Sequence, residues 1–96
     1  MPKVVNLSRR KPQVVHDGEV YIGHRLNKWA NPFKIGRDGT REQVIALYEY
    51  FVRSKPELTA ALPELRGKDL ACWCAPKPCH GDVLLRLVEL KAKGEL

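Results

Sequence analysis

The chain has 96 residues, a net charge of +6 and 44% hydrophobic residues. This length suits one globular domain over residues 1–96, with 91–96 as a polar, frayed tail. No apolar run is long enough to span a membrane, and residues 1–6 lack the apolar core of a secretory signal. Three cysteines, two of them one residue apart, argue against a disulfide framework and favour a reducing cytoplasm.

The positive charge is concentrated in the first half of the chain. Residues 1–48 hold nine Lys or Arg and four Asp or Glu, a balance of +5. Residues 49–96 hold eight and seven, a balance of +1. A basic half is typical of proteins with an anionic partner such as nucleic acid, a nucleotide or another phosphate compound. A charge of this size is also common on the solvated surface of small domains.

Three short segments have the composition of strands, namely residues 4–7, 19–23 and 69–73. An Asp-Gly pair at positions 17 and 18 separates two apolar runs. Such a pair is a strong hairpin signal because both turn positions need a positive φ. We therefore predict that residues 13–16 and 19–23 form a hairpin within a small mixed sheet.

Two longer segments carry apolar residues at helical spacing. Thr40 and Gln43 fit a capping box at the start of a helix over residues 41–53. A second apolar face predicts a helix over residues 80–91. Helices packed on a mixed sheet make a single three-layer α/β domain, for which we expect a Rossmann-like arrangement.

Residues 24–34 form an aperiodic segment that mixes cations with aromatic rings. An irregular loop of this length in so small a domain is often functional. Arg25, Lys28 and Asn31 offer hydrogen-bond donors for a phosphate or a base. Trp29 offers a flat face on which a base could stack, and it could equally anchor the loop in the core.

Residues 70–82 hold all three cysteines and one of the three histidines. They lie where a predicted strand ends and a predicted helix begins, which is where open α/β sheets bind ligands. One interpretation is an anion pocket at the start of the helix, with Cys74 and Lys77 among the binding residues. Cys79 is then the candidate nucleophile and His80 the general acid or base, while Asp82 orients His80 or favours the helix start.

Two other interpretations of the same stretch stay open. In one, a zinc ion is bound by Cys72, Cys74, Cys79 and His80. The residue types suit zinc, although Cys-x-Cys with an adjacent Cys-His pair departs from the usual spacing of zinc knuckles. In the other, the cysteines are small core residues that pack at the turn.

Two motifs are distinctive: Trp29-Ala30-Asn31-Pro32-Phe33, and Cys72-Trp73-Cys74 followed by Cys79-His80. With them, residues 4–90 resemble domain-of-unknown-function family 4326, a group of small uncharacterised phage and bacterial proteins. Ala30 stands where that family usually has glycine. The resemblance implies a compact α/β domain and brings no established reaction. The strand-to-helix segment is also locally similar to one in another uncharacterised bacterial family with a Rossmann-like sheet.

We therefore expect a nucleotide- or nucleic-acid-directed protein, with enzymatic activity left open. Its phosphate or base pocket is expected between residues 24–34 and residues 74–82. The alternative is a non-enzymatic, zinc-stabilised module that docks nucleic acid or a host protein. Zinc is expected as a cofactor only in that alternative, and no membrane partner is expected in either.

Overall fold

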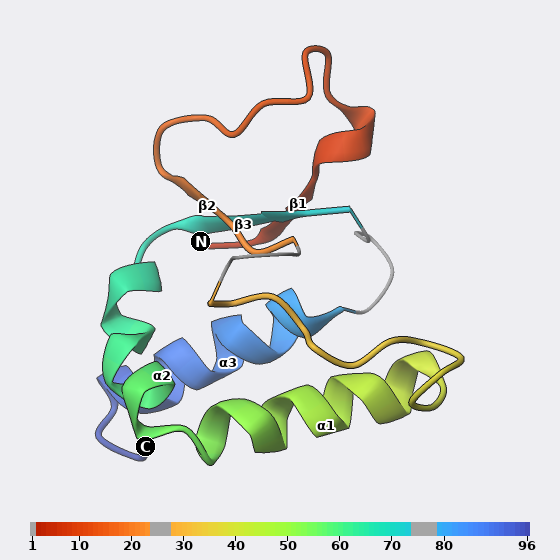
Figure 1. The fold of residues 1–96 in the computed structure, drawn as a ribbon. Coiled ribbons are helices and arrows are strands. Elements are labelled where there is room, and N and C mark those ends of the chain that lie inside the picture. The colour runs from red at the N-terminus through yellow and green to blue at the C-terminus, as the bar shows by residue number, and fades with distance from the viewer. Residues whose placement is uncertain (1, 24–27, 74–78) are drawn as a thin grey trace.

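The computed structural model describes residues 2–23, 28–73 and 79–96. Figure 1 shows short strands packed beside helices. The strands are β1 (Val4–Asn6), β2 (Glu19–Tyr21) and β3 (Asp69–Cys72). The helices are α1 (Arg41–Arg53), α2 (Pro56–Ala61) and α3 (His80–Ala92), with two short 3-10 helices, η1 (Leu7–Arg9) and η2 (Leu62–Leu65). The three predicted strands and two predicted helices are confirmed to within two residues at each end.

The sheet is parallel throughout. Strand β3 lies in the centre, and both β1 and β2 run parallel to it. Val4 of β1 and Val20 of β2 face Leu70 of β3 from opposite sides. The expected mixed sheet is therefore wrong. Parallel neighbours need long crossover connections, and each pair of neighbouring strands here is indeed far apart in the sequence.

The predicted hairpin is also wrong, although its turn exists. The Glu19 N–H donates to the carbonyl oxygen of His16 (3.1 Å), and Gly18 has a φ of 85°. Residues 13–16 form no strand, because an ion pair orders this segment instead. The Arg10 guanidinium donates to both carboxylate oxygens of Glu19 (2.7 and 2.9 Å) and to the carbonyl oxygen of Val14 (2.8 Å).

The strand order places the connections on opposite faces of the sheet. The strands lie in the order β1-β3-β2. The connection from β1 to β2 therefore passes over β3, and the connection from β2 to β3 returns in the opposite direction. Right-handed crossovers in opposite directions run over opposite faces. Figure 1 shows residues 7–18 above the sheet and all three α-helices below it. The layer above the sheet therefore consists of η1 and an irregular segment, and the α-helices of the described residues all lie in the layer below it.

Helix α1 begins where its local sequence directs. The Thr40 hydroxyl accepts a hydrogen bond from the Gln43 N–H (3.2 Å), and the Gln43 side chain accepts one from the Thr40 N–H (2.8 Å). This capping box satisfies amides that the first turn leaves open. Val44, Tyr48 and Val52 are buried at a spacing of four residues, so one stripe of the helix faces the core.

Helix α3 packs close to the sheet because its second residue is glycine. A Cβ atom at Gly81 would lie 2.8 Å from the Val4 Cγ2 and 2.9 Å from the Ile22 Cδ1. The helix then buries Val83, Leu84 and Leu87 against the sheet and α1. In the described part of the chain, no helix combines the length and apolar character needed to cross a membrane.

We expect Glu19→Gln to lower the midpoint of thermal unfolding at neutral pH, because the amide cannot pair with the charge of Arg10. Hydrogen bonds from Arg10, and next from the His16 N–H, lower the pKa of Glu19 from 4.5 to about 2. The carboxylate therefore stabilises the fold above pH 4.5, and this stabilisation is lost as the pH falls toward about 2.

Scanning fluorimetry across that pH range measures the difference between wild type and Glu19→Gln. The difference should be largest at neutral pH and should shrink as the solution is acidified. Glu95→Gln, which changes an exposed carboxylate near the C-terminus, serves as the matched control. A difference that does not vary with pH would show that the charge of Glu19 is not the stabilising feature.

Candidate functional site

The loop that leads into α1 is held by the side chain of Asn31. Its Oδ1 accepts a hydrogen bond from the Phe33 N–H (2.9 Å), and its Nδ2 donates to the carbonyl oxygen of Val44 (3.4 Å). The first bond forms a local Asx turn, and the second ties the turn to α1. Phe33 then packs edge-on against Phe51, with ring centroids 6.3 Å apart.

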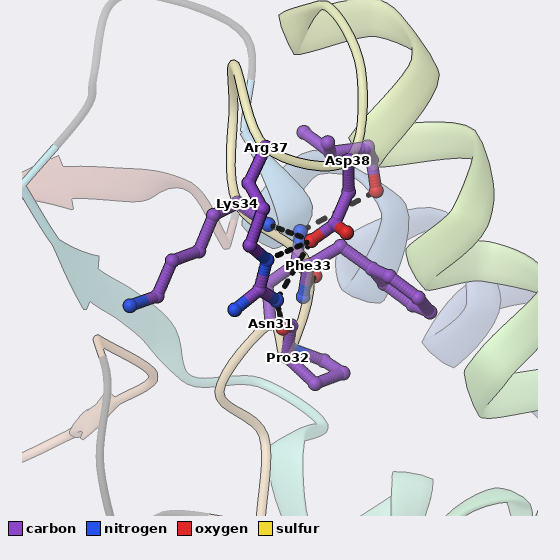
Figure 2. A network of polar contacts seen from close by, with 7 residues as sticks. Asn31, Pro32, Phe33, Lys34, Arg37 and Asp38 are labelled. Atoms are coloured by element: carbon purple, nitrogen blue, oxygen red, sulfur yellow. Dashed lines mark hydrogen bonds and ion pairs between the residues drawn. The ribbon is translucent and has the colours of Figure 1, made fainter.

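Asp38 closes the same loop on itself, as Figure 2 shows. Its Oδ2 accepts hydrogen bonds from the Lys34 N–H (2.8 Å) and from the Arg37 guanidinium (2.8 and 3.0 Å). Arg37 also donates to the carbonyl oxygen of Pro32 (3.1 Å). The hydrogen bond from Arg37, followed by that from Lys34, lowers the pKa of Asp38. These bonds fix the backbone and leave the Lys34 side chain at the surface.

Trp29 packs in the core rather than at the surface. Its side chain is 3% exposed, and its carbonyl oxygen accepts a hydrogen bond from the buried Tyr48 hydroxyl (2.7 Å). Burial, and next the neighbouring Cys79, raises the pKa of Tyr48. The structure therefore supports the anchoring role of Trp29 and leaves no open face for the predicted stacking role.

The side chain of Lys28 also contacts other groups of the protein. Its ammonium group pairs with Glu64 at 2.7 Å and lies 5.5 Å from the centre of the Trp29 ring. The pair is exposed, so it contributes little stability. Nevertheless, the Glu64 carboxylate offsets the positive charge of Lys28, which was predicted to bind a phosphate or a base.

The start of α3 is capped by its own side chains. The Cys79 Sγ accepts a hydrogen bond from the Gly81 N–H (3.3 Å), and the Asp82 Oδ2 accepts one from the Cys79 N–H (3.0 Å). Asp82 is exposed at the surface. Of its two predicted roles, favouring the helix start is the one for which a direct contact exists.

His80 is buried, with 8% of its surface exposed. Its Nε2 lies 2.7 Å from the carbonyl oxygen of Ile22. A carbonyl oxygen can only accept, so Nε2 carries the proton and Nδ1 is the basic nitrogen. Burial lowers the pKa of His80, and the bond to Ile22 and the charge of Asp82 oppose this effect more weakly. At neutral pH the ring is therefore neutral, and it can accept a proton at Nδ1.

A pocket of about 260 Å³ joins the loop, α1 and α3. Its polar and charged lining consists of Asn31, Lys34, Arg41, Cys79 and His80. None of the described residues that line it is acidic. It thus brings together three predicted site residues, whereas Lys28, Trp29 and Asp82 lie outside its lining. Arg25, Cys74 and Lys77 fall outside the described residues.

Sequence reasoning missed two cations of this pocket, Lys34 and Arg41. They lie on either side of a tight turn in which the Gly36 N–H donates to the carbonyl oxygen of Gly39 (2.7 Å). The turn brings the two segments together, and the Gly-x-x-Gly spacing was the one available signal. That spacing is weak because it is equally typical of an ordinary turn.

The cysteines give a partial geometry for metal binding. The Sγ atoms of Cys72 and Cys79 lie 3.6 Å apart. In a tetrahedral zinc site, Zn–S bonds of about 2.3 Å place two sulfurs roughly 3.8 Å apart. Within residues 2–23, 28–73 and 79–96, no three metal-ligating side chains gather. The predicted fourth ligand, Cys74, lies outside those ranges.

We expect Tyr48→Phe to lower the free energy of unfolding by about 1–3 kcal/mol, because it leaves the buried carbonyl of Trp29 without its donor. Urea titration followed by circular dichroism measures the loss. Tyr50→Phe is the matched control, since Tyr50 is 74% exposed on the same helix and its change should stay within about 0.5 kcal/mol. Equal stability of the two variants would contradict the anchoring role of the Tyr48 hydroxyl.

The chain resembles two viral proteins that are themselves uncharacterised. One, from Acanthamoeba polyphaga mimivirus, is 34% identical over 96% of this chain and 83% of its own length. The other, a 12.4 kDa protein from the nrdA-td intergenic region of Enterobacteria phage T4, is 44% identical over 75% of this chain and 69% of its own length. No solved structure gives a significant match.

The family assignment follows from nearly the whole chain. The matching family model covers residues 5–90, which include the strands and α-helices except the first residue of β1 and the last two residues of α3. This range contains every residue that lines the pocket. The chain therefore belongs to the family described as Domain of unknown function (DUF4326).

Proposed function

We propose that the protein binds a nucleotide or nucleic acid in the pocket between the loop at Asn31, the start of α1 and the start of α3. The observation that carries this proposal is the convergence of positive charge. The first residues of two helices, Arg41 and His80, line the same pocket. A helix N-terminus is the positive end of its dipole and favours an anion.

The side chains of the pocket add to this field. Lys34 and Arg41 are cationic, and the described lining contains no Asp or Glu. A phosphate group is the biological anion that suits such a site in a chain of net charge +6. The apolar remainder of the lining, including Phe33 and Ile45, suits a base or a sugar.

The position of the pocket in the sheet also supports the proposal. Residues 7–18, which follow β1, lie over one face of the sheet, and α3, which comes after β3 in the chain, lies over the other (Figure 1). Open α/β sheets bind ligands at the carboxyl ends of strands whose connections lie on opposite faces. This topology supports a Rossmann-like relationship as part of the proposal. The proposal also includes a cytoplasmic setting, which the cysteine content favours because thiols stay reduced there.

If the protein is an enzyme, the residues at the start of α3 would each have a specific role. His80 would act as a general base through Nδ1, because Nε2 already donates to Ile22. Cys79, which lines the pocket beside it, would be the nucleophile. Asp82 would act indirectly by capping the helix that carries both residues.

We expect Lys34→Glu to weaken binding of fluorescein-labelled oligo(dT) or mant-dATP by about tenfold or more, because a charge-assisted contact to phosphate is replaced by repulsion. Fluorescence anisotropy at several salt concentrations measures both affinity and its salt dependence. For oligo(dT), affinity should fall steeply with salt, and less steeply in Lys34→Glu.

Lys68→Glu provides the matched control, because it makes the same charge reversal just before β3, at the opposite end of the sheet. Its affinities should stay within about twofold of wild type. Equal losses in the two variants would indicate a general charge effect rather than a pocket. Absence of binding by the wild-type protein to both probes would overturn the proposal.

A zinc-stabilised binding module remains the second candidate, favoured by the 3.6 Å separation of the Cys72 and Cys79 sulfurs. The Gly81 N–H that donates to the Cys79 Sγ would stabilise a thiolate ligand. His80 could join only through Nδ1 in its present orientation. In this candidate, the metal contributes folding energy to a small core.

Zinc binding has a direct measurement. The module predicts one zinc per chain in native mass spectra of untagged protein, and its loss in Cys79→Ser. It also predicts a lower unfolding midpoint after treatment with a chelator, because metal affinity then contributes to stability. A chain mass without metal, together with an unchanged midpoint, would eliminate the module and leave the pocket proposal untouched.

A further inference from the structure

Trp73 is a large aromatic residue that the core does not use. It follows the last residue of β3 directly, and 41% of its surface is exposed. In the same strand, Leu70 and Cys72 are buried in the core. Tryptophan combines a large apolar ring with a single N–H, so partial exposure at the end of a strand leaves indole surface open to a ligand.

The exposed indole is held in a fixed position. Its Nε1–H donates to the hydroxyl oxygen of Tyr21 (2.9 Å), the last residue of the neighbouring strand β2. The Tyr21 ring in turn lies over Gly23, where a Cβ atom would be only 1.9 Å from the Tyr21 hydroxyl oxygen. Glycine at position 23 therefore provides the space that this arrangement needs, and three residues cooperate to orient one aromatic surface.

We propose that Trp73 is a stacking platform for an unpaired base of single-stranded nucleic acid. The proposal rests on the proposed function in taking nucleic acid as the ligand, and it deepens that function by assigning the contact to the base. The Trp73 N–H already donates to Tyr21, so we expect the indole to contribute apolar ring surface to a ligand rather than a hydrogen-bond donor. Stacking on such a face tolerates any base, because every base has a π surface.

The platform and the pocket are linked through adjacent residues. The hydroxyl of Tyr21 holds Trp73, and the carbonyl oxygen of Ile22 holds His80. Because Tyr21 is the last residue of β2 and Ile22 follows it directly, both contacts lie at the carboxyl end of β2. A net charge of +6 favours a polyanionic ligand over a neutral apolar partner. A duplex hides the faces of its bases, so the single strand is the form that fits.

The test compares fluorescein-labelled oligo(dT) with an abasic strand of equal length and charge. Wild type should bind oligo(dT) about fivefold to a hundredfold more tightly than the abasic strand, the range expected for stacking of a base on an aromatic ring. Trp73→Ala should remove this preference without weakening binding of the abasic strand. Tyr50→Ala, at another exposed aromatic residue, should keep the preference.

Two further measurements guard against a folding defect in Trp73→Ala. Trp73→Phe retains a flat ring, so it should keep most of the preference for bases. In wild type, oligo(dT) should quench tryptophan fluorescence and the abasic strand should not, whereas Trp73→Phe should show no such quenching, since Trp29 is buried.

The outcomes separate the platform from the pocket. If wild type binds both strands equally, or if Trp73→Ala keeps the preference, the platform is overturned. In that case a loss of binding in Lys34→Glu still supports the pocket. If wild type binds neither strand, the platform is overturned as well, and binding of mant-dATP alone would then restrict the proposed function to free nucleotides.

Discussion

The hydrogen bond between the His80 Nε2 and the carbonyl oxygen of Ile22 is the contact on which the rest of the structure depends. It joins the first residue of α3 to the segment that follows β2, across 58 positions of sequence. Gly81 makes this bond compatible with packing, because a side chain there would collide with Val4 and Ile22. A sheet with strands of three or four residues has few ladder bonds, so such a junction carries much of its order.

The same bond determines what the site can do chemically. It places the proton of the imidazole on Nε2 and leaves Nδ1 basic, while burial keeps the ring neutral. The edge of the ring meets Tyr48, with centroids 4.9 Å apart, so α1 also restricts its orientation. One structural contact thus sets both the tautomer and the position of His80, the predicted general acid or base.

Local sequence was sufficient for most of the elements. The capping box at Thr40 and the apolar stripe of α1 depend on residues within a few positions, and both are confirmed. The order of the strands could not be predicted in this way. The Asp-Gly turn at 17 and 18 is present, yet the partner of β2 is Asp69–Cys72, which lies some 50 positions away. A hairpin signal describes a turn and does not identify which strand will pair beyond it.

Only part of the candidate site could be predicted, because only short-range signals can be recognised in the sequence. Asn31, Cys79 and His80 belong to two such short motifs, and all three line one pocket. Lys34 and Arg41 were missed because their proximity depends on the turn at Gly36 and on where α1 packs. Lys28 was assigned to a phosphate because the sequence does not reveal that Glu64 would lie 2.7 Å from it.

The distinctive motifs therefore divide into residues that build the fold and residues that face outward. Trp29 is buried, Asn31 holds a turn, and Cys79 caps a helix, so packing and hydrogen bonding account for each. The Cys-Trp-Cys segment differs, because its tryptophan stays exposed beside a cysteine that is fully buried. The Nε1–H of that indole donates to the Tyr21 hydroxyl, which fixes the ring at the end of the sheet. Trp73 is therefore the motif residue to which the proposed stacking on a base gives a role that packing in the core does not fill.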